Sequence, residues 1–88
     1  MTPYQVVLTH DARRFVDRAD ASLQRRLRRC FDILRAEPRK HPSAIRLRGE
    51  FAGHYRFRVG HYRVVYWIDE ARRTVVVVAI GHRRDVYR

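Results

Sequence analysis

The chain has 88 residues, which is enough for one compact domain. Its 20 basic and 9 acidic residues give a formal net charge of +11, so the expected partners are anionic: nucleic acid, an anionic surface or an acidic protein. A single cysteine excludes an internal disulfide, and no apolar run approaches the ~18 residues of a membrane span. We therefore expect one domain over residues 1–88, located in the cytoplasm and without a membrane partner.

The N-terminal half is predicted to form a short strand followed by two helices. Residues 4–8 are β-branched and aromatic, which is typical of a strand. Thr9 can cap a short helix, and Asp20 or Ser22 can start a second, stronger helix that ends before Pro38. One face of this second helix is apolar at helical spacing, with Leu23, Leu27, Cys30, Phe31 and Leu34.

The segment from Pro38 to His54 has no clear hydrophobic period and is predicted to be a loop. A loop of this length in so small a domain is commonly functional or locally packed. It carries three arginines, Arg39, Arg46 and Arg48.

The C-terminal half is predicted to form three strands. Residues 55–59 and 62–69 flank Gly60-His61, a pair suited to a two-residue type II′ hairpin turn. Residues 74–80 are apolar on both faces, as expected of a central strand covered on two sides. The predicted order is β-α-α-β-β-β, an α+β domain with two N-terminal helices packed on one face of a mostly antiparallel four-stranded sheet.

The predicted hairpin brings arginines together. If Gly60 and His61 form the turn, Arg58 lies opposite Arg63, and alternation places Arg56 on the same face, away from the core. Opposed like charges are destabilising, and a bound anion would relieve the repulsion. Guanidinium suits phosphate because its planar fork donates two hydrogen bonds at once. An ordinary solvated sheet face is the alternative interpretation.

The last residues, "GHRRDVYR", extend the basic character beyond the final strand. A tyrosine beside arginines is typical of single-stranded nucleic-acid sites, where it stacks on a base. Tyr87 can equally be a packing residue. The segment also supplies His82, Arg83 and Arg84.

The acidic residues do not indicate a metal site. They are scattered along the chain, and the adjacent pair Asp69-Glu70 falls in a predicted hairpin turn. No group of His, Cys, Asp or Glu has the spacing of metal ligands. We therefore expect no metal and no other cofactor.

Two motifs, "YRFRVGHYRVVY" and "GHRRDVY", resemble those of the RelE toxins in the RelE/ParE superfamily of type II toxin–antitoxin systems, and the likeness covers nearly the whole chain. The resemblance implies a RelE-like fold and an endoribonuclease of the mRNA interferase type. Such a toxin enters the A site of the 70S ribosome and cleaves the mRNA there by attack of the 2′-OH, without a metal. It also implies a cognate, small, RelB-like antitoxin.

The resemblance assigns roles to individual residues. It implies that the catalytic residues are Arg58, Arg63, Arg83 and Tyr87. The expected RNA-binding residues are Arg56, Arg46, Arg48, Arg84 and His82.

One departure from the family affects the general base. Some members carry lysines at the positions of Arg56 and Arg58, and one such lysine has been proposed as the base. Arginine stays protonated and is poorly suited to that role. Histidine exchanges protons near neutral pH, so His54, His61 and His82 are the alternative candidates.

Two other functions remain open at the level of sequence. The chain could be a ParE-like toxin that shares the fold and inhibits DNA gyrase. It could also be a basic RNA-binding domain without catalytic activity.

Overall fold

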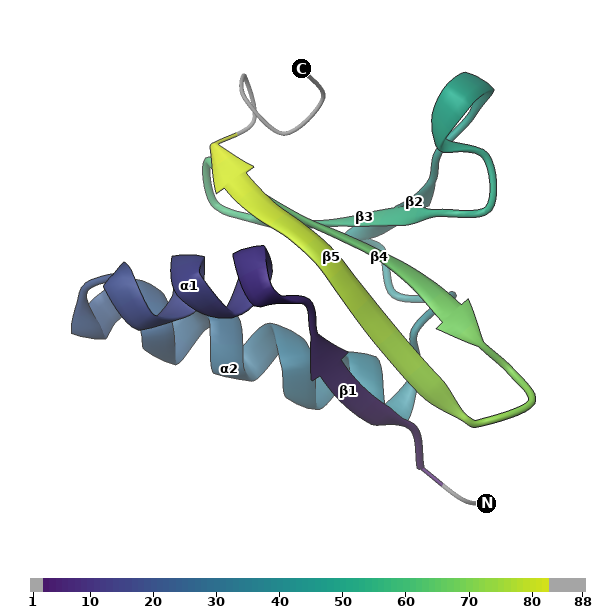
Figure 1. Ribbon diagram of the computed structural model, residues 1–88, viewed down its shortest axis with the longest axis horizontal. Helices are drawn as coiled ribbons and strands as arrows, with labels where there is room; N and C mark the ends of the chain where they lie inside the picture. The colour runs from purple at the N-terminus through teal and green to yellow at the C-terminus, as the bar shows by residue number, and fades with distance from the viewer. Residues whose placement is uncertain (1–2, 83–88) are drawn as a thin grey trace.

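The structure is a computed structural model, and it describes residues 3–82. The elements in chain order are β1 (Gln5–Leu8), α1 (His10–Arg18), α2 (Ala21–Ala36), β2 (Ala44–Arg46), the short 3-10 helix η1 (Gly49–Phe51), β3 (Tyr55–Val59), β4 (Tyr62–Asp69) and β5 (Thr74–His82). Both α-helices lie on the same side of the sheet (Figure 1). The predicted α+β architecture with two N-terminal helices is confirmed.

The sheet has five strands in the order β1-β5-β4-β3-β2, and this corrects the predicted count of four. β1 runs parallel to β5, and the other pairs are antiparallel. The additional strand, β2, lies in the segment predicted to be a loop, where Ala44 pairs with Phe57 and Arg46 pairs with Tyr55. β2 is only three residues long, so its strand conformation depends on pairing with β3 rather than on its own sequence pattern.

Thr9 caps α1 as predicted, and of the two candidates for α2 it is Asp20, not Ser22, that caps the helix. The Thr9 hydroxyl oxygen accepts a hydrogen bond from the Ala12 backbone N–H at 3.4 Å, and the Asp20 carboxylate accepts one from the Leu23 N–H at 2.8 Å. Each cap satisfies a backbone donor that has no partner inside its helix. The caps therefore fix where α1 and α2 begin.

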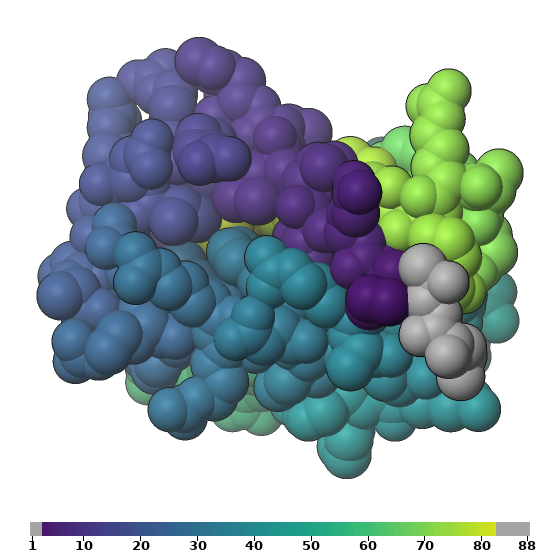
Figure 2. All heavy atoms as spheres, turned by 90° about the horizontal axis from the view of Figure 1, so that it is seen from below, coloured from purple at the N-terminus to yellow at the C-terminus, as the bar shows by residue number. Residues whose placement is uncertain are grey.

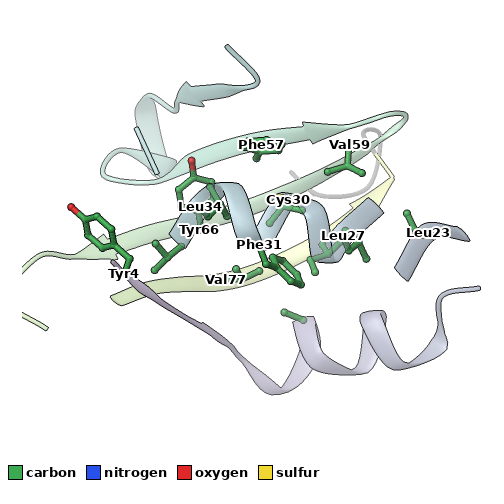
Figure 3. Packing of buried hydrophobic residues seen from close by; sticks show 14 residues of the cluster. Tyr4, Leu23, Leu27, Cys30, Phe31, Leu34, Phe57, Val59, Tyr66 and Val77 are labelled. Atoms are coloured by element: carbon green, nitrogen blue, oxygen red, sulfur yellow. The ribbon is translucent and has the colours of Figure 1, made fainter. Parts of the chain in front are cut away.

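The core lies between α2 and the sheet (Figure 3). Leu27 and Leu34 of α2 and Tyr66 of β4 have no exposed surface, and Cys30 has 2%. Burial raises the pKa of the Cys30 thiol to about 12, so the thiol stays neutral and packs as an apolar side chain. Each fully buried leucine contributes about 1.5–3 kcal/mol through removal from water. On the helical side, α1 and α2 cover most of the sheet (Figure 2).

β5 is covered on one face only, contrary to the expectation of cover on two sides. Val75 and Val77 have no exposed surface, because they point toward the helices. Val76 and Val78 are only partly buried. Within residues 3–82, no helix is long and apolar enough to cross a membrane.

Candidate nucleic-acid interface

The β3–β4 hairpin has the predicted register. Val59 pairs with Tyr62 across the turn, and Gly60 has a φ of +59°, the left-handed conformation that the first turn position requires. Arg58 consequently lies directly opposite Arg63. The predicted juxtaposition of like charges is confirmed.

The side chains of this hairpin alternate between two faces. Phe57, Val59 and Tyr66 belong to the buried cluster under the helices. Their neighbours along each strand project to the opposite face, which we call the open face. The open face of β2, β3 and β4 carries Ile45, Arg56, Arg58, Arg63, Val65 and Trp67.

The three arginines of the open face differ in exposure, which the sequence did not indicate. Arg58 is exposed and Arg56 is partly buried, but Arg63 is only 9% exposed. Opposite Arg63 on β5 lies Gly81, which has no side chain. The expectation of three guanidiniums on an uncovered surface is therefore wrong for Arg63. A largely buried cation attracts an anion more strongly than an exposed one, because water screens it less.

The turn itself positions Arg58. Its Nε donates a hydrogen bond to the Gly60 carbonyl oxygen at 3.4 Å, and its backbone N–H donates to the Ser43 backbone carbonyl oxygen at 3.1 Å. Arg26 of α2 reaches the same turn, since a Cβ placed on Gly60 would come within 2.7 Å of Arg26 Nη1. Arg26, Arg29 and Arg58 also line a pocket of about 220 Å³ between α2 and β3.

The approach of Arg26 to the hairpin turn was not predicted from the sequence. The spacing of Arg26 and Arg29 put both on one side of α2. Only the packing of α2 against β3 shows that this side borders the hairpin turn. The chain therefore gathers two further guanidinium groups, those of Arg26 and Arg29, near Arg58.

The loop arginines lie further from this pair. Arg46 is exposed at the end of β2 and pairs with Tyr55 of β3. Tyr55 precedes Arg58 by three residues on the same strand. That separation is about 10 Å along the strand. Arg48 is exposed immediately before η1. The structure does not bring either residue to the Arg58–Arg63 pair.

The candidate bases divide into two locations. His82 ends β5 opposite Tyr62, and its ring lies 6.3 Å from the His61 ring and 5.9 Å from the Tyr62 ring between centroids. These two histidines are therefore close to the turn next to Arg63. His54 precedes β3, about 13 Å along the strand from Arg58. Its Nδ1 is buried without a hydrogen-bond partner among the described residues, so His54 is poorly placed as a base.

The remaining predicted site residues, Arg83, Arg84 and Tyr87, lie outside the described residues. Their assignments stay predictions. Within residues 3–82, no group of three or more His, Cys, Asp or Glu side chains is placed to hold a metal ion.

Comparisons with known proteins match this fold to a toxin family. A family model described as the ParE toxin of the type II toxin–antitoxin system parDE matches residues 6–87. Toxin RelG of Mycobacterium tuberculosis is 48% identical over 42 residues. That match spans about half of each protein, 48% of this chain and 48% of RelG.

Solved structures agree with the family match. The RelBE2 toxin–antitoxin complex of Mycobacterium tuberculosis contains a chain 33% identical to this one, with a TM-score of 0.81 over 92% of this chain and 99% of that chain. A RelE–RelB complex of Pyrococcus horikoshii matches with 26% identity and a TM-score of 0.80, over 98% and 100% of the two chains. The RelBE complex of E. coli, at 21% identity, shares the fold with a TM-score of 0.75, over 90% and 95%.

Proposed function

The chain belongs to the RelE/ParE family of type II toxin–antitoxin toxins, and from this premise we propose that it is a ribosome-dependent endoribonuclease of the RelE type that cleaves mRNA in the A site. One observation supports the proposal most. Arg58 and Arg63 face each other on the side of the sheet that the helices leave uncovered, one exposed and one largely buried. Such a pair suits a phosphate that must be bound and then stabilised as its charge increases.

In the proposed reaction, the RNA supplies its own nucleophile. The 2′-oxygen attacks the adjacent phosphorus and the bond from phosphorus to the 5′-oxygen breaks. The departing 5′-oxygen takes a proton from solvent water, so the products carry a 2′,3′-cyclic phosphate and a 5′-hydroxyl. Arg58 and Arg63 donate hydrogen bonds to the phosphate oxygens, on which negative charge grows in the transition state. Preorganised donors of this kind each contribute roughly 10²–10³-fold in rate. Arg56, beside this pair, holds a flanking phosphate.

The proton of the 2′-OH requires a base other than arginine. His61 and His82 are the histidines nearest the turn, so they are the structural candidates. By resemblance to the family, Arg83 stabilises the charged phosphate and Tyr87 stacks on a base. The contributions of Arg83 and Tyr87 are tested by measuring mRNA cleavage on programmed ribosomes with variants of these two residues.

The proposed partners are an antitoxin, the 70S ribosome and its mRNA. The relatives from Mycobacterium tuberculosis and Pyrococcus horikoshii were solved as toxin–antitoxin complexes. A net charge of +11 favours an acidic, RelB-like antitoxin that covers the arginines. The same charge favours ribosomal RNA, with Arg46, Arg48, Arg84 and His82 among the contacting residues.

A cleavage assay on programmed ribosomes tests this function. We expect primer extension to reveal new mRNA 5′ ends inside the A-site codon, with no ends when the ribosome is omitted. Replacing the 2′-hydroxyl at the cleaved nucleotide by hydrogen should abolish these ends, because the nucleophile is then missing.

A supercoiling assay with DNA gyrase, run in parallel, separates the alternatives. Inhibition of supercoiling without new mRNA ends would identify a gyrase toxin instead. Ribosome binding without new ends and without gyrase inhibition would identify a non-catalytic RNA-binding domain.

A further inference from the structure

Trp67 occupies an unusual position on the open face. It is 37% exposed, one of three large apolar side chains that stay exposed among the described residues. It follows Arg63 by four residues on β4, so alternation places both side chains on the same face. It is also the only tryptophan of the chain.

Trp67 is one end of a row of apolar side chains that crosses three strands. Val76 pairs with Trp67 across β4 and β5, and Val7 pairs with Val76 across β5 and β1. Val7 is 42% exposed and Val76 is partly buried. Contiguous exposed apolar patches rimmed by polar residues mark interaction sites, whereas singly exposed apolar side chains need no such explanation.

Trp67 lies on the same strand as Arg63, whereas the apolar row runs across the sheet from β4 to β1. Arg63 and Trp67 are separated by about 13 Å along β4. Val65 lies between them, with Arg56 opposite it on β3. No acidic residue interrupts this stretch of β4. The nearest one, Asp69, follows Trp67 and accepts a hydrogen bond from the Arg72 backbone N–H at 3.2 Å.

We infer that Trp67 is a base-stacking residue, which positions a nucleotide flanking the phosphate bound by Arg58 and Arg63. This inference rests on the proposed function, because it extends the RNA path along β4 from the cleavage site. The guanidinium groups neutralise phosphates at one end of the path, and the indole offers an apolar plane at the other. Stacking on an aromatic ring tolerates any base, because every base has a π-face. Trp67 would therefore increase affinity without restricting sequence.

The sole tryptophan makes stacking directly measurable. We expect the fluorescence of Trp67 to be quenched when an eight-nucleotide oligoribonucleotide is titrated into the protein at low salt. Fluorescence that stays constant while a labelled oligonucleotide binds, as judged by its anisotropy, would overturn the inference.

Three variants separate stacking from simple apolar contact. Trp67→Leu keeps an apolar side chain without a ring and should weaken binding of the labelled oligonucleotide roughly 5- to 150-fold, which is the loss of one base stack. Trp67→Phe keeps a ring and should lose less. Val7→Ala shortens a neighbour in the same row and should bind within about 2-fold of the wild type. Equal losses for Trp67→Leu and Val7→Ala would overturn the stacking role.

The position of the stacked base is found on programmed ribosomes. Abasic nucleotides, placed one at a time on either side of the scissile phosphate, should slow single-turnover cleavage by the wild type at one flanking position. At that position, the abasic substitution and Trp67→Leu should not add, because each removes the same stack. Additive losses at every position would contradict the inference.

The outcomes distinguish this inference from the proposed function. If the wild type cleaves and Trp67→Leu cleaves and binds equally well, stacking is wrong and the function stands. If the wild type forms no new mRNA ends but Trp67 is quenched and Trp67→Leu binds weakly, the function is wrong and stacking stands. If Trp67→Leu leaves RNA binding unchanged but no longer binds a RelB-like antitoxin, the row is an antitoxin surface and the inference is overturned.

Discussion

Tyr66 shows how one polar atom can fix the position of a loop in the core. Its side chain has no exposed surface, and its hydroxyl donates a hydrogen bond of 2.6 Å to the Pro38 carbonyl oxygen. Burial raises the pKa of Tyr66 above its ordinary value, so the hydroxyl keeps its proton and remains a donor. This bond joins the end of α2 to the centre of β4.

Replacing Tyr66 by phenylalanine should lower the free energy of unfolding by about 1–3 kcal/mol, because the buried carbonyl of Pro38 loses its donor. Urea denaturation measures the change. Tyr55→Phe is the matched control, since the Tyr55 ring stacks on Tyr66 with centroids 5.6 Å apart but its hydroxyl has no hydrogen bond within residues 3–82. Equal destabilisation by both substitutions would contradict this role for the Tyr66 hydroxyl.

For single residues, the sequence predicts the face of the sheet on which a side chain lies better than it predicts the solvent exposure of that side chain. Alternation and the Gly60-His61 turn correctly placed Arg58 opposite Arg63, because both follow from local geometry. The burial of Arg63 was not predictable, since it depends on tertiary packing rather than on the local pattern of the strand. The approach of Arg26 to Gly60 was missed for the same reason.

Among the elements, the β4–β5 turn is held to the N-terminus by a cluster of four polar side chains. Tyr4 donates to Glu70 Oε1 at 2.8 Å, Arg39 Nη2 lies 2.5 Å from Glu70 Oε2, and Arg73 Nη1 lies 3.0 Å from Glu70 Oε1. The Arg73 guanidinium also lies 4.0 Å from the centre of the Tyr4 ring. The cluster connects the segment before β1, the loop after α2 and the β4–β5 turn, at residues far apart in the sequence.

This cluster predicts a dependence of stability on pH. The hydrogen bonds from Arg39 and Tyr4 lower the pKa of Glu70 in the folded protein below its ordinary value of 4.5. Its stabilising contribution is therefore complete above pH 4.5 and is lost as the pH falls through the lowered value. Between pH 6 and pH 3, the melting temperature of the wild type should fall more than that of Glu70→Gln. The control is Glu50→Gln, which removes an exposed carboxylate without an ion pair in the described part of the chain and should follow the wild type.

The elements also show where sequence reasoning stops. Thr9 and Asp20 predict where their helices begin, because each cap side chain binds a backbone N–H only three residues later in the chain. β2 has no such local signal: it becomes a strand because Ala44 meets Phe57, thirteen positions later in the chain. The partial exposure of β5 has the same origin, since only the assembled fold shows that both helices pack on one side.

For the molecule as a whole, the net charge of +11 predicts binding that weakens steeply with salt. If about five phosphates are contacted, the logarithm of the affinity for ribosomes should fall against the logarithm of salt concentration with a slope of roughly −3.5 to −4.5. Filter binding over a series of salt concentrations measures this slope. A slope near zero would mean that the arginines serve another purpose.

The central claim is that the open-face arginines act on the scissile phosphate, and not only through the total charge. Arg58→Gln and Arg25→Gln each remove one exposed arginine, the first from the open face and the second from α2, so both variants carry the same net charge. Neither substitution should change the free energy of unfolding by more than about 0.5 kcal/mol.

The most direct measurement is the single-turnover rate of mRNA cleavage on programmed ribosomes saturated with each variant. Arg58→Gln should cleave roughly 10²–10³-fold more slowly than the wild type, because one transition-state donor is lost. Arg25→Gln should cleave at nearly the wild-type rate. Equal rates for the two variants, whether fast or slow, would contradict this account of the site.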